Sequence, residues 1–157
     1  MRLTVHSDFA LRLLMYLALS EGRLATIADI AARYGISKNH LMKVAYNLGA
    51  AGYIETVRGR SGGLRLARPA QDINLGDVVR FSEPDMALVP CFKPIEEDCA
   101  IAPCCGLRGA LARANAAFLA VLDDYSLADL VKPRASMRAL LGIDAAAPRR
   151  AAAGAGR

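Results

Sequence analysis

The stretch that decides the fold is TIADIAARYGISKNHLMKVAYNLGAAGYIETVRGRSGGLRL, residues 26–66. Its first part predicts two short amphipathic helices, because apolar residues recur at i, i+3, i+4 and i+7 in each. Thr26, with Asp29 three residues on, is placed to cap the first helix, and Ser37 is placed to cap the second. Gly35 between them can adopt the positive φ of a tight turn. Together these features predict a helix-turn-helix.

The second of these helices has one side that could read DNA. Its apolar residues would face the core, and small or polar donors gather on the opposite side near the helix start. That is where a recognition helix meets base edges and phosphates. An ordinary solvated helix surface shows the same pattern, so the segment that follows is needed to distinguish a recognition helix from a solvated surface. The candidate DNA-binding residues here are Ser37, Lys38, Asn39, His40 and Lys43.

A basic hairpin follows the two helices. Residues 53–57 and 64–66 read as strands, and RGRSGG between them reads as a tight turn. A hairpin directly after a helix-turn-helix is a wing, and arginines on a thin glycine-rich loop can enter the narrow minor groove of DNA. The chain is therefore expected to hold a DNA-binding winged helix. The candidate residues at the tip are Arg58, Arg60 and Ser61.

Further helices are expected on either side of this unit. Residues 8–20 are apolar on nearly all sides and predict a buried helix. A short helix is expected near residues 76–81, with Asn74 or Asp72 as its cap. From Gly106 onward a heptad-like seam predicts a long helix that dimerises with a second copy, although a core helix within one chain is the alternative. The seam consists of Leu107, Leu111, Ala114, Phe118, Val121 and Tyr125.

All four cysteines of the chain lie between these regions. The sequence shows no export signal and no membrane-spanning run, so we expect a cytoplasmic protein with reduced thiols. Cys104 and Cys105 are neighbours, and one small site rarely uses both, which leaves three well-spaced thiolates. Three thiolates suit an iron–sulfur cluster whose remaining iron takes a weaker ligand. Zinc, redox-active thiols and incidental cysteines are the alternatives.

Charge and length suggest how the chain is divided. Residues 1–70 hold 10 Lys or Arg against 4 Asp or Glu, whereas residues 71–132 hold 5 against 10. The basic N-terminal part is the natural nucleic-acid face.

The sequence shows no catalytic triad, phosphate loop or carboxylate pair, so an enzyme is not expected. An iron–sulfur electron carrier is the alternative to a DNA-binding regulator. We expect a winged helix-turn-helix domain at residues 1–84 and a cysteine loop at residues 85–105. A dimerisation helix with a short C-terminal helix is expected at residues 106–132. A tail at residues 133–157 is expected to be largely disordered after about residue 143.

The chain resembles the Rrf2 family of bacterial winged-helix regulators over about residues 1–132. The motifs that carry the resemblance are MRLTVHSDFALRLLMYLA, YGISKNHLMKV, GYIETVRGRSGGLRLARP, INLGDVVRFSEP, CAIAPCCGLRGAL and AFLAVLDDYSLADLV. The resemblance implies a cluster of the four-iron (4Fe–4S) type, with a two-iron (2Fe–2S) cluster as the alternative. It implies Cys91, Cys99 and Cys105 as ligands, with Asp8 of the partner subunit as a fourth ligand. A simple helix N-cap is the other interpretation of Asp8.

Within that family the chain resembles the branch of nitric-oxide-sensing repressors. The resemblance implies a homodimer that binds a double-stranded operator until nitric oxide damages its cluster. An iron-responsive or redox-responsive repressor of the same family is the alternative, because the ending YSLADLVK resembles the iron-responsive branch. A third branch uses a histidine soon after its last cysteine, and the segment GLRGAL has none.

Overall fold

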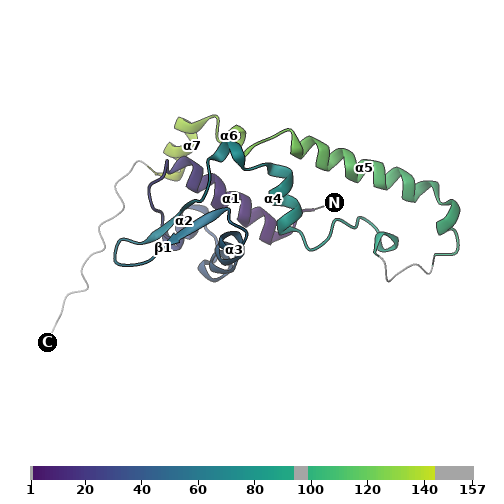
Figure 1. Ribbon diagram of the computed structural model, residues 1–157, viewed down its shortest axis with the longest axis horizontal. Helices are drawn as coiled ribbons and strands as arrows, with labels where there is room; N and C mark the ends of the chain where they lie inside the picture. Colours follow the sequence, from purple (N-terminus) through teal and green to yellow (C-terminus); the bar gives the residue numbers. More distant parts are fainter. Residues whose placement is uncertain (1, 94–98, 144–157) are drawn as a thin grey trace.

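The computed structural model describes residues 2–93 and 99–143, and it is mainly helical with one small hairpin. Figure 1 shows α5 extending to one side of a body that contains the other labelled elements. The expected fold class, a winged helix-turn-helix with a long additional helix, is confirmed. The elements are α1 (Val5–Leu19), α2 (Ile27–Tyr34), α3 (Lys38–Ala50), β1 (Ile54–Val57), β2 (Gly63–Leu66), α4 (Leu75–Ser82), α5 (Gly106–Asp123), α6 (Leu127–Leu130) and α7 (Arg134–Leu141), with short 3-10 turns at Ala70–Asp72, Pro90–Phe92 and Ala102–Cys104.

Helix α1 is the centre of the core. It contacts α3, α4, α6, α7 and β2, and Leu13, Leu14 and Leu19 are fully buried. The prediction of a helix buried on several faces is correct, but its start was placed too late. The N-cap is Thr4, whose hydroxyl accepts a hydrogen bond from the Ser7 amide at 3.2 Å. Asp8 therefore lies inside the helix, and its interpretation as an N-cap is wrong.

The helix-turn-helix forms as its sequence predicts. Thr26 and Asp29 make a reciprocal capping box at the start of α2. Gly35 ends α2 at φ 64°, and its N–H donates to the Ala31 carbonyl. Ser37 stands at the N-cap position of α3, but its side chain makes no capping hydrogen bond, so that part of the prediction is wrong. Ser37 is exposed, so water can satisfy the free amides of the first turn of α3.

The wing is the antiparallel hairpin of β1 and β2. Ile54 lies opposite Leu66 and Val57 lies opposite Gly63. Leu64 also exchanges backbone hydrogen bonds of 2.8 and 3.0 Å with Ala25, which ties the hairpin to the start of the helix-turn-helix. A Cβ at Gly63 would lie 2.9 Å from the Ala25 carbonyl oxygen, so the close approach requires glycine.

The end of α5 is fixed to the start of α4. Asn74 caps α4 as predicted, and its side-chain amide donates to the Asp123 carbonyl at 2.7 Å. Arg80 makes two hydrogen bonds to the Asp123 carboxylate, of 2.7 and 2.6 Å. Gly76 leaves room for that carboxylate, because a Cβ there would lie 1.9 Å from it. These bonds set the direction in which α5 leaves the body.

The C-terminal helices return to α1. Leu127 of α6 is buried, and Met137 and Leu141 of α7 pack against the core. Arg134 forms an ion pair of 2.8 Å with Glu21, just beyond the end of α1. The region assigned to a tail thus begins with a docked helix, and the disorder predicted after about residue 143 lies outside the described residues.

Candidate DNA-binding and cysteine sites

The predicted polar residues of α3 are exposed, and its predicted apolar residues face the core. Leu41, Val44, Ala45 and Leu48 are buried, as the apolar spacing predicts. The candidate residues are all exposed at the start of α3 or just before it: Ser37, Lys38, Asn39, His40 and Lys43.

Besides their packing in the core, α1 and α3 share one aromatic and one polar contact. The ring of His40 lies 6.4 Å from that of Phe9, measured between centroids. The Asn47 side-chain nitrogen lies 3.4 Å from Nε2 of His6. Phe9 and His6 belong to the first two turns of α1, so the start of α1 lies against α3.

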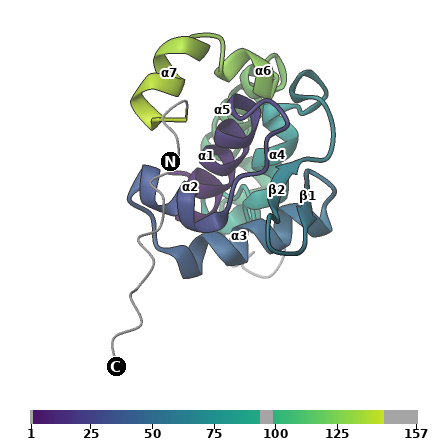
Figure 2. The same cartoon turned by 90° about the vertical axis from the view of Figure 1, so that its left-hand side faces the viewer.

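The wing brings the second set of candidates to the same side of the molecule. Arg58, Arg60 and Ser61 are exposed in the loop between β1 and β2. Figure 2 shows α3 and the hairpin side by side, and β1 contacts α3 directly. On the strands, Glu55 and Arg65 face each other and pair at 2.8 Å, which stiffens the base of the wing.

Two exposed residues of α3 were missed by the sequence reasoning. Tyr46 is 77% exposed and Met42 is 43% exposed. They follow Asn39 at i+7 and i+3, on the side that was examined only for polar residues. Helical spacing from Asn39 would have identified both.

The cysteines are free thiols in and around the loop before α5. Cys91 is half-buried, Cys99 and Cys104 are exposed, and half-buried Cys105 stands at the N-cap of α5 without a capping bond. The Cys104 thiol donates to the Ile101 carbonyl at 3.6 Å. The choice of Cys105 over Cys104 as a ligand stays a prediction.

The structure does not gather the predicted ligands. Among the described residues, no three His, Cys, Asp or Glu side chains form a group that could hold a metal ion. Residues 94–98, which join Cys91 to Cys99, lie outside those residues. By donor chemistry the loop still fits an iron–sulfur cluster, because it offers several thiols that are not in disulfides.

Asp8 is paired within its own chain. Its carboxylate lies 2.9 Å from Nε of Arg12, one turn further along α1. The Arg12 guanidinium in turn lies 5.8 Å from the centroid of the Tyr34 ring, at the end of α2. To bind a partner's metal, Asp8 would have to share its carboxylate with Arg12 or give up this ion pair.

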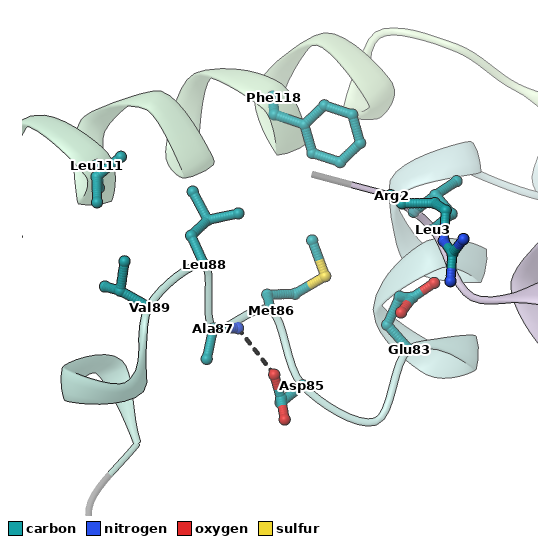
Figure 3. A pocket seen from close by; sticks show the side chains of 10 residues that line it. All are labelled: Arg2, Leu3, Glu83, Asp85, Met86, Ala87, Leu88, Val89, Leu111 and Phe118. Atoms are coloured by element: carbon teal, nitrogen blue, oxygen red, sulfur yellow. Dashed lines mark hydrogen bonds between the residues drawn. The ribbon is translucent and has the colours of Figure 1, made fainter. Parts of the chain in front are cut away.

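The first part of the loop is packed against α5. Figure 3 shows a pocket in which Met86 and Leu88 point toward Leu111 and Phe118 of α5. The Asn115 side chain donates to the Met86 carbonyl at 3.0 Å. The pocket also includes Glu83, whose carboxylate accepts a hydrogen bond from the Thr4 amide at 2.8 Å. The loop, α5 and the start of α1 are therefore physically connected.

Helix α5 has no buried residue, so the alternative of a core helix within one chain is wrong. The predicted seam divides into two sides. Leu111 and Phe118 are half-buried in the pocket, whereas Leu107 and Val121 are 65% and 57% exposed. The sequence could not show this division, because the segment that covers Leu111 and Phe118 has no recognisable pattern of its own.

Comparison with known proteins identifies the family of this chain. A profile of the Rrf2 family, described as an iron-dependent transcriptional regulator, matches residues 3–133. The chain belongs to the Rrf2 family. The "HTH-type transcriptional regulator NsrR" of Bacillus subtilis is 51% identical over 142 residues, covering 90% of this chain and 97% of that protein. The NsrR of Geobacillus kaustophilus has the same identity and coverage.

Solved structures agree with the Rrf2 assignment. CymR, the global cysteine regulator of B. subtilis, superimposes with a TM-score of 0.67 and 26% identity, covering 83% of this chain and 95% of CymR. The family match and the NsrR relatives identify the protein as a DNA-binding transcriptional regulator of the Rrf2 family. Among the described residues, none of the helices is both long and apolar enough to span a membrane.

Proposed function

We propose that this Rrf2 protein is a homodimeric repressor that binds its operator with an iron–sulfur cluster in place and releases it on exposure to nitric oxide. The observation that carries the proposal is the physical link from the cysteine loop to the winged helix. The NsrR relatives and the sequence resemblance support the choice of signal.

Helix α3 and the wing would share the work of DNA binding. The start of α3 would enter the major groove, where Asn39 and His40 can hydrogen-bond to base edges and Lys38 and Lys43 can pair with phosphates. Arg58 and Arg60 would enter the neighbouring minor groove, with Ser61 beside them. A dimer would place one such set on each half of a pseudo-palindromic operator.

Cys91, Cys99 and Cys105 would hold the cluster, with Asp8 of the partner subunit as the fourth ligand. A four-iron cluster suits this set, with a two-iron cluster as the alternative. When bound, such a cluster supplies iron that nitric oxide can attack, and a carboxylate corner binds iron less firmly than a thiolate. Asp8 pairs with Arg12 in the free chain. If Asp8 bound the partner's cluster instead, this ion pair would break and Arg12 would remain beside the Tyr34 ring.

Helix α5 would form the dimer. Its 18 residues form a rod of about 27 Å at 1.5 Å per residue, and one side of it bears exposed apolar groups such as Leu107 and Val121. Pairing with a second α5 would bury this side.

The chain's own bonds can transmit the state of the loop to the DNA-binding face. The loop is tied to α5 through Asn115, and α5 is tied to α4 through Arg80 and Asp123. Glu83, at the end of α4, holds Thr4 at the start of α1. The first turns of α1 then contact α3. A coupling of about 1–3 kcal/mol is typical of allosteric switches and suffices to release a promoter.

An iron-responsive repressor is the second candidate. It is favoured by the description of the family as iron-dependent and by the chain's ending. In that case loss of the cluster under iron starvation would be the signal, with the same residues in the same roles.

Cysteine substitutions test the proposal. In anaerobically prepared protein, Cys91→Ala, Cys99→Ala and Cys105→Ala should each lose the visible absorbance of the cluster and tight operator binding. Cys104→Ala, the matched control, should keep both. Operator binding that survives in all four variants would refute cluster-dependent repression, and a requirement for Cys104 in place of Cys105 would reassign the third ligand.

A further inference from the structure

Helix α3 carries an exposed row that is only half polar. Asn39, Met42, Lys43 and Tyr46 stand at i, i+3, i+4 and i+7, on the side opposite the buried residues. Asn39 and Lys43 are already candidates for DNA contact. The other two members of the row are large and apolar, and Tyr46 is 77% exposed.

Neither side chain belongs to the hydrophobic core of the described residues. Over the described part of the chain, Tyr46 has no recorded hydrogen bond and no ring contact. The hydrophobic core beneath α3 is filled from its other side. A single exposed apolar residue needs no explanation. Two exposed apolar residues on the proposed DNA-facing surface do need an explanation, because polar residues at these positions would stabilise the helix equally well.

Major-groove chemistry offers a ligand for them. Thymine is the base that presents a methyl group in that groove, and apolar side chains recognise it by contact. The spacing i, i+3, i+4 and i+7 is the one by which the reading helix of a homeodomain places its base-contacting residues. From Asn39 to Tyr46 the helix rises about 10 Å, which corresponds to about three base pairs.

We propose that Met42 and Tyr46 are specificity residues that recognise thymine 5-methyl groups in the operator half-site. The Tyr46 hydroxyl, at the end of the same side chain, is free to bond a neighbouring base edge or phosphate. This inference rests on the proposal that α3 is the recognition helix. It goes further by naming thymine as the base that the two apolar residues select.

Uracil substitution tests the inference, since uracil differs from thymine only in lacking the methyl group. Operator duplexes are first selected from a random DNA library with the cluster-loaded protein. Each thymine of the half-site is then replaced singly by uracil. For the parent we expect a loss of about fourfold in affinity at each of two positions, the value of one buried methyl group.

The variants assign each methyl group to a side chain. Met42→Ala and Tyr46→Ala should each bind more weakly and become insensitive to uracil at one position, while keeping their sensitivity at the other. Tyr46→Phe should keep the sensitivity to both methyl groups. Leu140→Ala is the matched control, because Leu140 is an exposed apolar residue of α7, and it should behave as the parent.

The outcomes separate this inference from the function on which it rests. A parent protein that selects no duplex would overturn both. A parent that binds tightly but tolerates uracil at every position would overturn only the methyl contact. So would a selected half-site without thymine, or a Tyr46→Ala variant that keeps the full uracil sensitivity of the parent.

Discussion

Replacement of Gly35 by alanine should destabilise the protein through the turn of the helix-turn-helix. Gly35 has φ 64° and ψ 32°, and a Cβ built there meets no atom within 4 Å. The penalty is therefore conformational and not steric. An alanine in the left-handed region costs about 1–2 kcal/mol. The smaller entropy of the unfolded alanine chain offsets about 0.4–1 kcal/mol of this.

The net loss should be about 1 kcal/mol of the free energy of unfolding. For a protein of this size that corresponds to a fall of about 2–4 °C in Tm. Gly49→Ala is the matched control, because Gly49 lies within α3 and its Cβ would meet only Ile54 at 4.0 Å. Alanine is favoured over glycine inside a helix, so this variant should gain about 0.5–1 kcal/mol.

Urea denaturation measures both effects, with parent and variants in the same state of cluster loading. The midpoints should move in opposite directions with unchanged slopes. If Gly35→Ala proved as stable as Gly49→Ala, the left-handed turn would not be the feature that orders α2 and α3, and the reasoning would fail.

Three other substitutions test separate parts of the account. Burial raises the pKa of Tyr34 to about 12, against a smaller lowering by Arg12, so the folded state holds its phenol proton more tightly than the unfolded state. The stability from this difference is present below about pH 10 and lost as the pH rises toward 12, and Tyr34→Phe should flatten that loss in alkaline urea titrations; an unchanged loss would contradict it. Asp8→Ala should keep a cluster but shift its visible spectrum and weaken operator binding before any nitric oxide is added, whereas an unaltered spectrum and affinity would leave Asp8 only its role beside Arg12. Arg60→Ala should weaken binding to specific and non-specific DNA alike and lower the slope of the salt dependence by about 1, and unchanged binding would remove the wing from the interface.

Local signals were sufficient for the helix-turn-helix and the wing. The capping box at Thr26, the left-handed glycine at Gly35 and the alternating strands all depend on residues close together in sequence. The start of α1 was misplaced because the helix was taken to begin with the apolar run at Asp8, and Thr4 was not considered as its cap. Tyr46 was missed because the exposed side of α3 was searched only for polar residues.

Contacts distant in sequence could not be predicted. Arg80 and Asp123 are 43 residues apart, and Arg134 lies 113 residues from Glu21. No sequence pattern links the members of either pair. The same limit applies to the cysteines, because thiol spacing restricts which ligands can share a site but does not bring them together. Their assignment stays a prediction that only ligand substitution can test.

Simultaneous measurement of the cluster and of DNA binding tests the central claim most directly. Protein prepared without oxygen is titrated with nitric oxide while its visible absorbance and the fluorescence anisotropy of a selected operator duplex are recorded together. The account predicts that the cluster absorbance and the bound DNA fall in parallel, and that Cys105→Ala shows neither signal from the start. Operator binding that persists after the cluster absorbance has disappeared would contradict it.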